Sequence, residues 1–218
     1  MVLHDWYIEP REYERHEARR GRRHAFDIVD PGRTALVVID MVPFFVEENP
    51  YARGIVPNIQ RLADALRSAG GTVAWVLPST EAPTPARAEF LGPTIAERYR
   101  TSGGTGPLRD RLWHQFDIDA ADLLVEKSSA GAFFPGRCDL GGQLDELGID
   151  TVRVAGTVAN VCCESTARDA SGLGYRVVMV ADVNAAMRNQ DLNATLHTIY
   201  RSFGDMRATD DLIDLIET

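Results

Sequence analysis

A carboxylate, an ammonium and a thiol each stand at the end of a short apolar run of this sequence or just after one. Asp40 ends TALVVID, Lys127 ends LLVEK, and Cys162 follows TVRVAG in the first turn of a predicted helix. The thiolate is the reactive form of cysteine, and a nearby lysine and a helix N-terminus both favour it. Asp40 is suited to accept the thiol proton and return it to a leaving nitrogen. Together these residue types predict amide hydrolysis by a nucleophilic cysteine.

The elements that must position these residues follow from the alternation of apolar runs with segments of helical periodicity. This alternation is typical of a parallel sheet with crossover helices, in which ligands bind at the carboxyl ends of the strands. The three side chains would then converge on one edge of the sheet. Strands are predicted at 34–40, 72–77, 123–127, 151–156 and 176–182. Helices are predicted from Pro57 to the Gly70-Gly71 pair and at 140–147, 160–173, 191–203 and 209–216, and Asn160 is the predicted N-cap of the third.

The segment 78–106 is rich in proline and glycine, and it predicts a long loop with one short helix at 95–99. Long loops in compact domains are often functional lids. The aromatic residues near the predicted strand ends are candidates for the walls of a substrate pocket, and core packing is the alternative interpretation for all of them. These candidates are Phe44, Phe45, Trp75, Phe133 and Phe134.

Each reactive residue also has an ordinary structural interpretation. An aspartate at a strand end can serve only as a cap, and a lysine there usually extends into solvent. A small cysteine in a helix is commonly a packing residue, and this is our interpretation of Cys163 and Cys138. The coincidence of three reactive types at three strand ends favours a site, but periodicity does not identify the reaction.

Length and composition indicate one domain, which we place at 34–218 after an extension at 1–33. The chain has 218 residues, of which 44% are hydrophobic. It lacks an apolar run of about 20 residues, as a membrane span requires, and its N-terminus is charged where a signal peptide is apolar, so we expect a cytoplasmic protein.

Its three cysteines do not make a disulfide scaffold, so free thiols are expected. The formal net charge of −9 argues against nucleic-acid binding.

One basic cluster departs from this acidic balance. It consists of Arg19, Arg20, Arg22 and Arg23, and the acidic residues Glu9, Glu12, Glu14 and Glu17 surround it. Interspersed charges of both signs are typical of a solvated arm or a subunit contact, which we favour over a site for a polyanion.

Three segments, VVIDMVPFF, VEKSSAGAFF and GTVANVCCESTARDA, resemble in that order the motifs of the isochorismatase-like cysteine hydrolases. This superfamily includes nicotinamidases, carbamoylsarcosine amidases and ureidoacrylate amidohydrolases, and the likeness extends from about Thr34 to the C-terminus. The resemblance implies a three-layer α/β/α fold with a six-stranded parallel sheet, usually in a homo-oligomer. It also implies a catalytic triad of Asp40, Lys127 and Cys162 that works through a thioester.

The resemblance also separates the two adjacent cysteines. The nucleophile of the superfamily lies six residues after the glycine that ends the preceding strand, which is Gly156 here, and so it falls on Cys162 rather than Cys163. A cis peptide bond is implied at Thr157–Val158. The backbone amides of Val158 and Cys162 would then form the oxyanion hole.

The sequence departs from the superfamily pattern at a few positions. Val42 stands where a glutamine is frequent, and Ala159 stands where a threonine is frequent. The segment 77–90 offers no counterpart to the aspartate and histidines with which nicotinamidases bind a metal. We therefore expect no metal and no cofactor, and the similarity does not favour a nicotinamidase.

Two other functions remain open from the sequence. Some relatives hydrolyse the enol ether of isochorismate by an acid alone, and a non-catalytic small-molecule-binding scaffold could use the same fold. Cys162 favours the amidase, because a thiolate nucleophile has a use at an acyl carbon and none at an enol ether. The stretch NVCCESTARD is most similar to the ureidoacrylate group, which points to a carbamoyl or ureido substrate.

Overall fold

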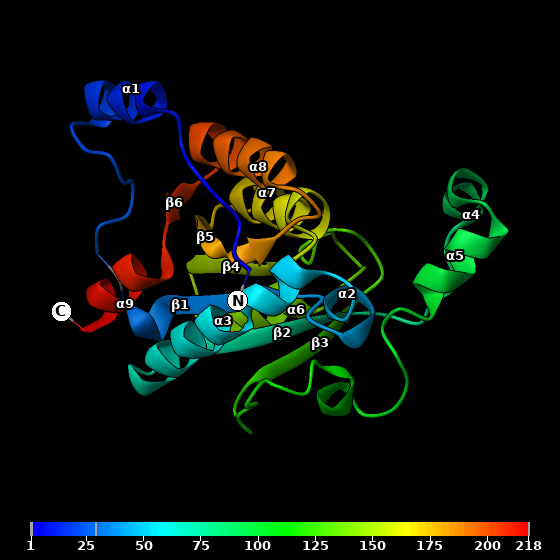
Figure 1. Cartoon of the computed structure of the whole chain (residues 1–218). Coiled ribbons are helices and arrows are strands. Elements are labelled where there is room, and N and C mark those ends of the chain that lie inside the picture. The colour runs from blue at the N-terminus through cyan, green and yellow to red at the C-terminus, as the bar shows by residue number, and fades with distance from the viewer. Residues whose placement is uncertain (1, 29, 218) are drawn as a thin grey trace.

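The computed structural model describes residues 2–28 and 30–217, and within them six parallel strands form one sheet (Figure 1). The strand order is β3-β2-β1-β4-β5-β6. The strands are β1 (Thr34–Ile39), β2 (Thr72–Pro78), β3 (Leu123–Lys127), β4 (Thr151–Thr157), β5 (Arg176–Ala185) and β6 (Asp205–Arg207). Every residue of β1 is buried, as expected of a central strand that is covered on both faces. The predicted three-layer α/β/α fold is confirmed.

Helices cover the two faces of the sheet, and alternate residues of each strand contact opposite layers. Ala35, Val37 and Ile39 of β1 pack in one core cluster, whereas Leu36 and Val38 pack in the other. The first cluster lies under α6 (Leu140–Glu146), α7 (Glu164–Gly172) and α8 (Asn189–Ser202), and the second lies under α3 (Pro50–Ser68) and α9 (Thr209–Glu217). The remaining elements are α1 (Pro10–Arg20), α2 (Pro43–Val46), α4 (Pro85–Leu91), α5 (Pro93–Arg100), the 3₁₀ turns η1 (Pro31–Arg33) and η2 (Leu108–Arg111), and the π-helical turn η3 (Ala159–Cys163).

Two helix starts differ from the predictions. α3 begins at Pro50 rather than at Pro57, because the Asn49 side chain accepts hydrogen bonds from the Tyr51 and Ala52 amides and caps the helix there. The helix predicted to begin at Asn160 begins instead as η3, and no side chain caps it. The prediction that Pro57 begins a helix was therefore wrong, because Pro57 lies inside α3. The prediction that Asn160 caps a helix was also wrong.

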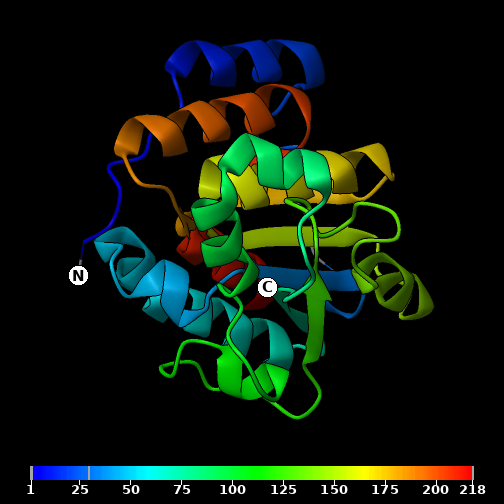
Figure 2. The ribbon, with the colours of Figure 1, turned by 90° about the vertical axis from the view of Figure 1, so that its right-hand side faces the viewer.

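The segment 78–106 also differs from the predicted loop. It contains two helices, α4 and α5, which project beyond the carboxyl edge of the sheet (Figures 1 and 2). The Thr84 side chain accepts a hydrogen bond from the Arg87 amide and starts α4, and a proline stands at the beginning of each helix. Phe90, Ile95 and Tyr99 on these helices are exposed. Prolines here begin helices rather than interrupt them.

The N-terminal extension is a docked arm rather than a solvated one. Its helix α1 lies along the outer side of α8, as both ribbon views show. His16 is buried, and its Nε2–H donates to the Tyr200 carbonyl oxygen at 3.0 Å. The Tyr200 hydroxyl donates to the Arg23 carbonyl oxygen at 2.7 Å. Within the described residues, no helix is long and apolar enough to cross a membrane.

Candidate active site

Asp40 stands where the chain leaves β1 at the carboxyl edge of the sheet. Its φ of +54° lies in the left-handed region, which aspartate tolerates better than most residues with a side chain. The Asp40 amide donates to the Val76 carbonyl oxygen at 2.9 Å, so the turn is tied to β2. The residue is 1% exposed. A carboxylate is thus held in a buried position with a fixed orientation.

Lys127 ends β3 and reaches across the end of β2 to this carboxylate. Its Nζ lies 2.9 Å from Asp40 Oδ2, 3.2 Å from the Ser129 carbonyl oxygen and 3.5 Å from Cys162 Sγ. An ammonium group has three N–H donors, and these contacts occupy all of them. Lys127 is buried, contrary to the solvent-exposed interpretation of a lysine at a strand end. It bridges the carboxylate and the thiol.

Cys162 is brought to the same edge by the close approach of β4 to β1. Gly156, near the end of β4, has a φ of +118°. A Cβ at this position would lie 2.1 Å from the Ile39 carbonyl oxygen of β1. Only glycine fits there. The peptide bond Thr157–Val158 is cis, as the resemblance implies, and η3 then carries Cys162. The three predicted catalytic residues are therefore brought together.

The electrostatics of the thiol differ from the prediction. Burial and, to a smaller extent, the Asp40 carboxylate raise the pKa of Cys162 to about 12, against the lowering effect of the Lys127 cation. Burial alone would lower the pKa of Lys127, but Asp40 and Cys162 outweigh it and raise that pKa. The resting site thus holds an ion pair beside a neutral thiol. Lys127 lowers the pKa of Cys162, as predicted for a nearby cation, but burial and Asp40 outweigh it.

Asp40 Oδ1 is a buried oxygen without a hydrogen-bond partner in the described part of the chain. A buried carboxylate oxygen normally has a partner, because leaving it unpaired costs about 1–3 kcal/mol. Its neighbour Oδ2 is fully engaged with Lys127. Oδ1 is therefore the acceptor that this site leaves open.

Thr166 is a residue of the site that the sequence interpretation missed. It is fully buried. Its hydroxyl donates to the Cys162 carbonyl oxygen at 2.7 Å, and the Thr166 Oγ1 accepts from the Ala132 amide at 3.0 Å. Thr166 thereby connects the turn that carries the Cys162 thiol to the loop that begins after Lys127, the last residue of β3. A threonine four residues after the cysteine on a helix was the available signal, since its hydroxyl can reach back to that carbonyl.

The aromatic candidates separate into two groups. Trp75 is wrong as a pocket residue, because it is fully buried in the middle of β2 and its Nε1–H donates to Asp122 Oδ2 at 2.7 Å. Phe133 is also a core residue, 4% exposed and packed against the Tyr175 ring. Phe44 and Phe45 follow Asp40 on α2 and are partly buried, and Phe134 is 52% exposed. Phe44, Phe45 and Phe134 therefore remain candidates for contact with a substrate at the carboxyl edge of the sheet.

The other two cysteines have different surroundings from Cys162. Cys163 is fully buried and packs in the core cluster under α7, and burial raises its pKa well above the ordinary value. Cys138 is partly buried, and all three thiols are free. In residues 2–28 and 30–217, no cluster of three or more histidine, cysteine or acidic side chains is placed to hold a metal ion.

The isochorismatase domain family matches residues 34–211. The chain belongs to the isochorismatase family. YwoC of Bacillus subtilis, an uncharacterised member, is 31% identical over 193 residues, which cover 87% of this chain and 97% of that protein. The ureidoacrylate amidohydrolase RutB of Agrobacterium fabrum is 28% identical over 85% of this isochorismatase-family chain and 91% of its own length. The crystal structure of a cysteine hydrolase from Pseudomonas syringae pv. phaseolicola has a TM-score of 0.77 and 28% identity, and the match covers 87% of this chain and 94% of that one.

Proposed function

We propose that this isochorismatase-family hydrolase cleaves a C–N bond of a small amide, carbamoyl or ureido compound, with Cys162 as nucleophile, Asp40 as proton carrier and Lys127 as the supporting cation. One observation carries the proposal: the unpartnered, buried Asp40 Oδ1 lies in a site whose other polar groups are paired. A base that must accept a proton needs a free lone pair, and this oxygen has one.

In the proposed first step, the Cys162 thiol transfers its proton to Asp40 Oδ1 while Sγ bonds to the substrate carbonyl carbon. The C=O electron pair moves onto oxygen, and the backbone amides of Val158 and Cys162 donate to that oxyanion. The intermediate then collapses, the C–N bond breaks, and Asp40 returns the proton to the leaving nitrogen. An acyl thioester on Cys162 remains.

In the proposed second step, water gives a proton to Asp40 and attacks the thioester carbon. The C–S bond breaks, and the proton returns to Cys162 Sγ, which restores the resting site. Lys127 keeps its ion pair with Asp40 whenever that group is ionised, and its N–H toward sulfur stabilises negative charge there. The high pKa of the resting thiol fits this cycle, since transfer to Asp40 occurs only with substrate bound.

The substrate class rests on similarity and on the surroundings of the site. RutB is named for a ureido substrate, and the chain is similar to it over most of both lengths. Phe44, Phe45 and Phe134 are proposed as the apolar contacts of the substrate. A carbamoyl or ureido carbon offers the same carbonyl and leaving nitrogen as an amide, so one mechanism serves all three compounds.

We also propose that the protein is cytoplasmic and forms a homo-oligomer, and the projecting α4–α5 hairpin supports the second of these proposals. Its base contacts α2, where the Phe44 and Tyr99 rings lie 5.9 Å apart, whereas Phe90 near its tip is 79% exposed. Contiguous exposed apolar patches mark protein–protein contacts, and Phe90, Ile95 and Tyr99 are all exposed on these two helices. A second copy is the proposed partner.

The test is a panel of primary amides, ureides and isochorismate, with release of ammonia or acid measured for the wild type and for the Cys162→Ser variant. Ammonia release from an amide or ureide that depends on Cys162 is expected. Turnover of isochorismate that survives Cys162→Ser would establish the enol-ether alternative, and inactivity toward the whole panel, with no substrate-protected alkylation, would support a binding scaffold.

A further inference from the structure

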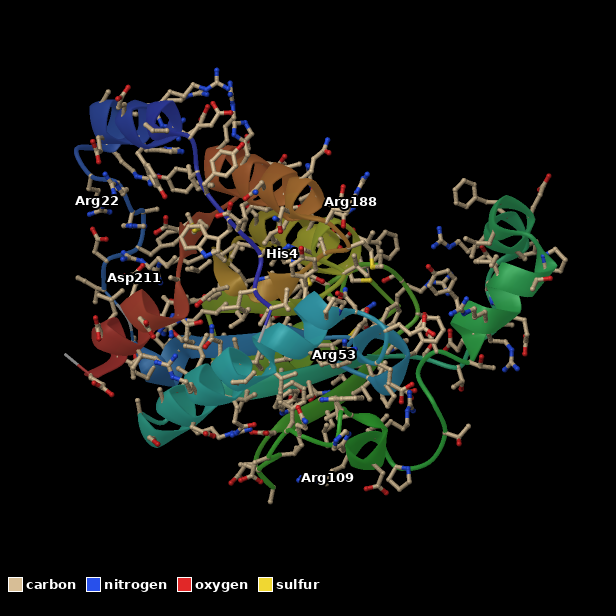
Figure 3. All side chains as sticks on the ribbon, viewed as in Figure 1. His4, Arg22, Arg53, Arg109, Arg188 and Asp211 are labelled. Carbon is tan, nitrogen blue, oxygen red and sulfur yellow. The ribbon has the colours of Figure 1, made fainter. Side chains whose placement is uncertain are left out.

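A cavity of about 440 Å³ lies between the docked N-terminal arm and the end of α8, away from the edge that bears Asp40. Figures 1 and 2 place α1 over the outer side of α8, and Figure 3 shows Arg22 labelled beside the segment that follows α1. A volume of this size lies in the range of about 300–1,000 Å³ that is typical of small-molecule pockets. The cavity is large enough for a metabolite rather than a single ion.

Four guanidinium groups line this cavity, which we call the arginine pocket: Arg15, Arg19, Arg20 and Arg201. Among its described lining residues, none carries a carboxylate. Buried Glu12 stands behind the wall and contacts Arg201 at 3.2 Å and Arg15 at 3.8 Å. Buried Asp205 also lies behind the wall, where it accepts hydrogen bonds from the Ala25 and Phe26 amides. The four guanidinium groups outnumber these two carboxylates, so the pocket is suited to an anion with several negative oxygens.

His16 fixes the direction of one of these arginines. Its Nε2–H donates to the Tyr200 carbonyl oxygen, so in the neutral ring Nδ1 is the acceptor. Arg19 Nη2 donates to that Nδ1 at 3.1 Å. Burial, followed by the charges of Arg20 and Arg19, lowers the pKa of His16 and keeps the ring neutral. Arg19 is thus anchored by an uncharged group, and its positive charge stays available to the pocket.

The wall of the arginine pocket is held in place on its other sides. Arg20 donates from Nε to the Arg22 carbonyl oxygen at 3.1 Å and from Nη2 to the Arg23 carbonyl oxygen, and so it closes the turn after α1. The Tyr200 hydroxyl also donates to Arg23. Phe26 and Phe203 contribute apolar surface next to these cations. A preorganised cationic wall beside flat rings reduces the entropy lost on binding.

We propose that the arginine pocket binds a small molecule that carries a phosphate or polyphosphate group. Guanidinium forks match the oxygen geometry of phosphate, and several forks from different directions match a group with more than one negative oxygen. The aromatic residues provide a surface for a planar ring, so a nucleotide and an inorganic polyphosphate share the chemistry that this pocket recognises. The whole chain has a formal net charge of −9, so this cluster of arginines stands out against an acidic background.

The test is calorimetric titration of the whole chain with ATP, pyrophosphate and inorganic phosphate at low and at high salt. Saturable binding is expected, stronger for pyrophosphate than for phosphate and weaker at high salt. Tighter binding of ATP than of pyrophosphate would identify the source as a nucleotide, and equal binding would identify a polyphosphate group alone. Arg19→Gln should weaken binding by about tenfold or more, because it removes charge-assisted hydrogen bonds.

The matched control is Arg11→Gln, the same change on the same helix at a side chain that is 68% exposed and does not line the pocket. It should leave binding unchanged. Arg15→Gln provides a second test if Arg19→Gln fails to fold, since the Arg15 side chain is 46% exposed. Absence of saturable binding, an equal loss in the Arg11 variant, or a change in oligomeric state in place of a loss of ligand binding would overturn the proposal.

Discussion

The Thr166 hydroxyl donates to the Cys162 carbonyl oxygen at 2.7 Å and accepts from the Ala132 amide at 3.0 Å. One buried hydroxyl therefore joins the turn that carries the proposed nucleophile to the loop that follows Lys127. This is a positioning contact, because Thr166 touches the backbone of the site and not its reacting atoms.

Thr166→Val keeps the shape of the side chain but leaves the Ala132 amide and the Cys162 carbonyl without their partner. Loss of such a buried pair costs about 1–3 kcal/mol. We expect kcat to fall about tenfold or more while KM changes little, because the thiol is displaced rather than the substrate contacts. Thr166→Ser should restore the rate. A Val variant with normal kcat, or a Ser variant as impaired as Val, would show that Thr166 only packs.

Asp40→Asn preserves the shape of the side chain but removes the proposed base. General acid–base catalysis is worth about 10² to 10⁴ in rate, so turnover should fall at least that far. Since the Asp40 carboxylate helps to raise the pKa of Cys162, the same variant should alkylate at lower pH than the wild type. Near-normal turnover in a folded Asn variant would remove Asp40 from the mechanism.

Lys127→Met should shift alkylation of Cys162 in the opposite direction. Lys127 lowers the pKa of this thiol, so its removal should raise the pH at which the thiol reacts. The rate of iodoacetamide labelling against pH measures the shift, with peptide mapping to separate Cys162 from Cys138. Circular dichroism tests whether the fold persists. An unchanged labelling profile together with full turnover would exclude Lys127 from the site.

Central parts of the fold and the convergence of Asp40, Lys127 and Cys162 on one edge were predictable because their signals are local. TALVVI reads as a strand buried on both faces, and residues at the ends of neighbouring parallel strands meet at one edge. β6 has only three residues, and its buried Asp205 breaks the apolar pattern, so periodicity cannot detect it. Its buried carboxylate is satisfied by the distant Ala25 amide. Only the folded chain provides such a partner.

The electrostatics of the thiol were not predictable for the same reason. Sequence places a lysine near Cys162, but the extent of burial is set by packing of distant segments, and burial is the largest influence on that pKa. Trp75 was misassigned because strand position alone does not say how far a ring lies from the carboxyl edge. Its hydrogen bond to Asp122 depends on the loop before β3. Both errors concern tertiary contacts.

The docked arm should loosen in acid. The His4 Nδ1–H donates to Asn189 Oδ1 at 2.7 Å and Nε2 accepts from the Ala186 amide at 3.1 Å, so the neutral ring is required. Burial lowers the pKa of His4 from its ordinary value of 6.5. A lowered histidine pKa means that the folded state binds fewer protons, so this stability is present above pH 6.5 and is lost as the pH falls below it.

Thermal unfolding monitored across this range should therefore give a lower Tm at acid pH. His4→Gln removes the titrating ring, so its Tm should depend less on pH, whereas the same change at the exposed His114 should leave the wild-type dependence intact. Equal pH dependence in the wild type and the His4 variant would show that His4 does not control docking.

The two adjacent cysteines provide the sharpest test of the mechanism. Adjacent residues on a helical turn point about 100° apart, and only Cys162 contacts Lys127 Nζ, whereas Cys163 packs in the core. Cys162→Ser should abolish hydrolysis, because a hydroxyl is a far weaker nucleophile than a thiol. Cys163→Val should leave turnover within a few-fold. With a slow substrate, mass spectrometry should place the trapped acyl group on Cys162, since its sulfur contacts the Lys127 ammonium whereas Cys163 is fully buried in the core. An adduct on Cys163, or a fully active Cys162→Ser variant, would overturn the proposed reaction.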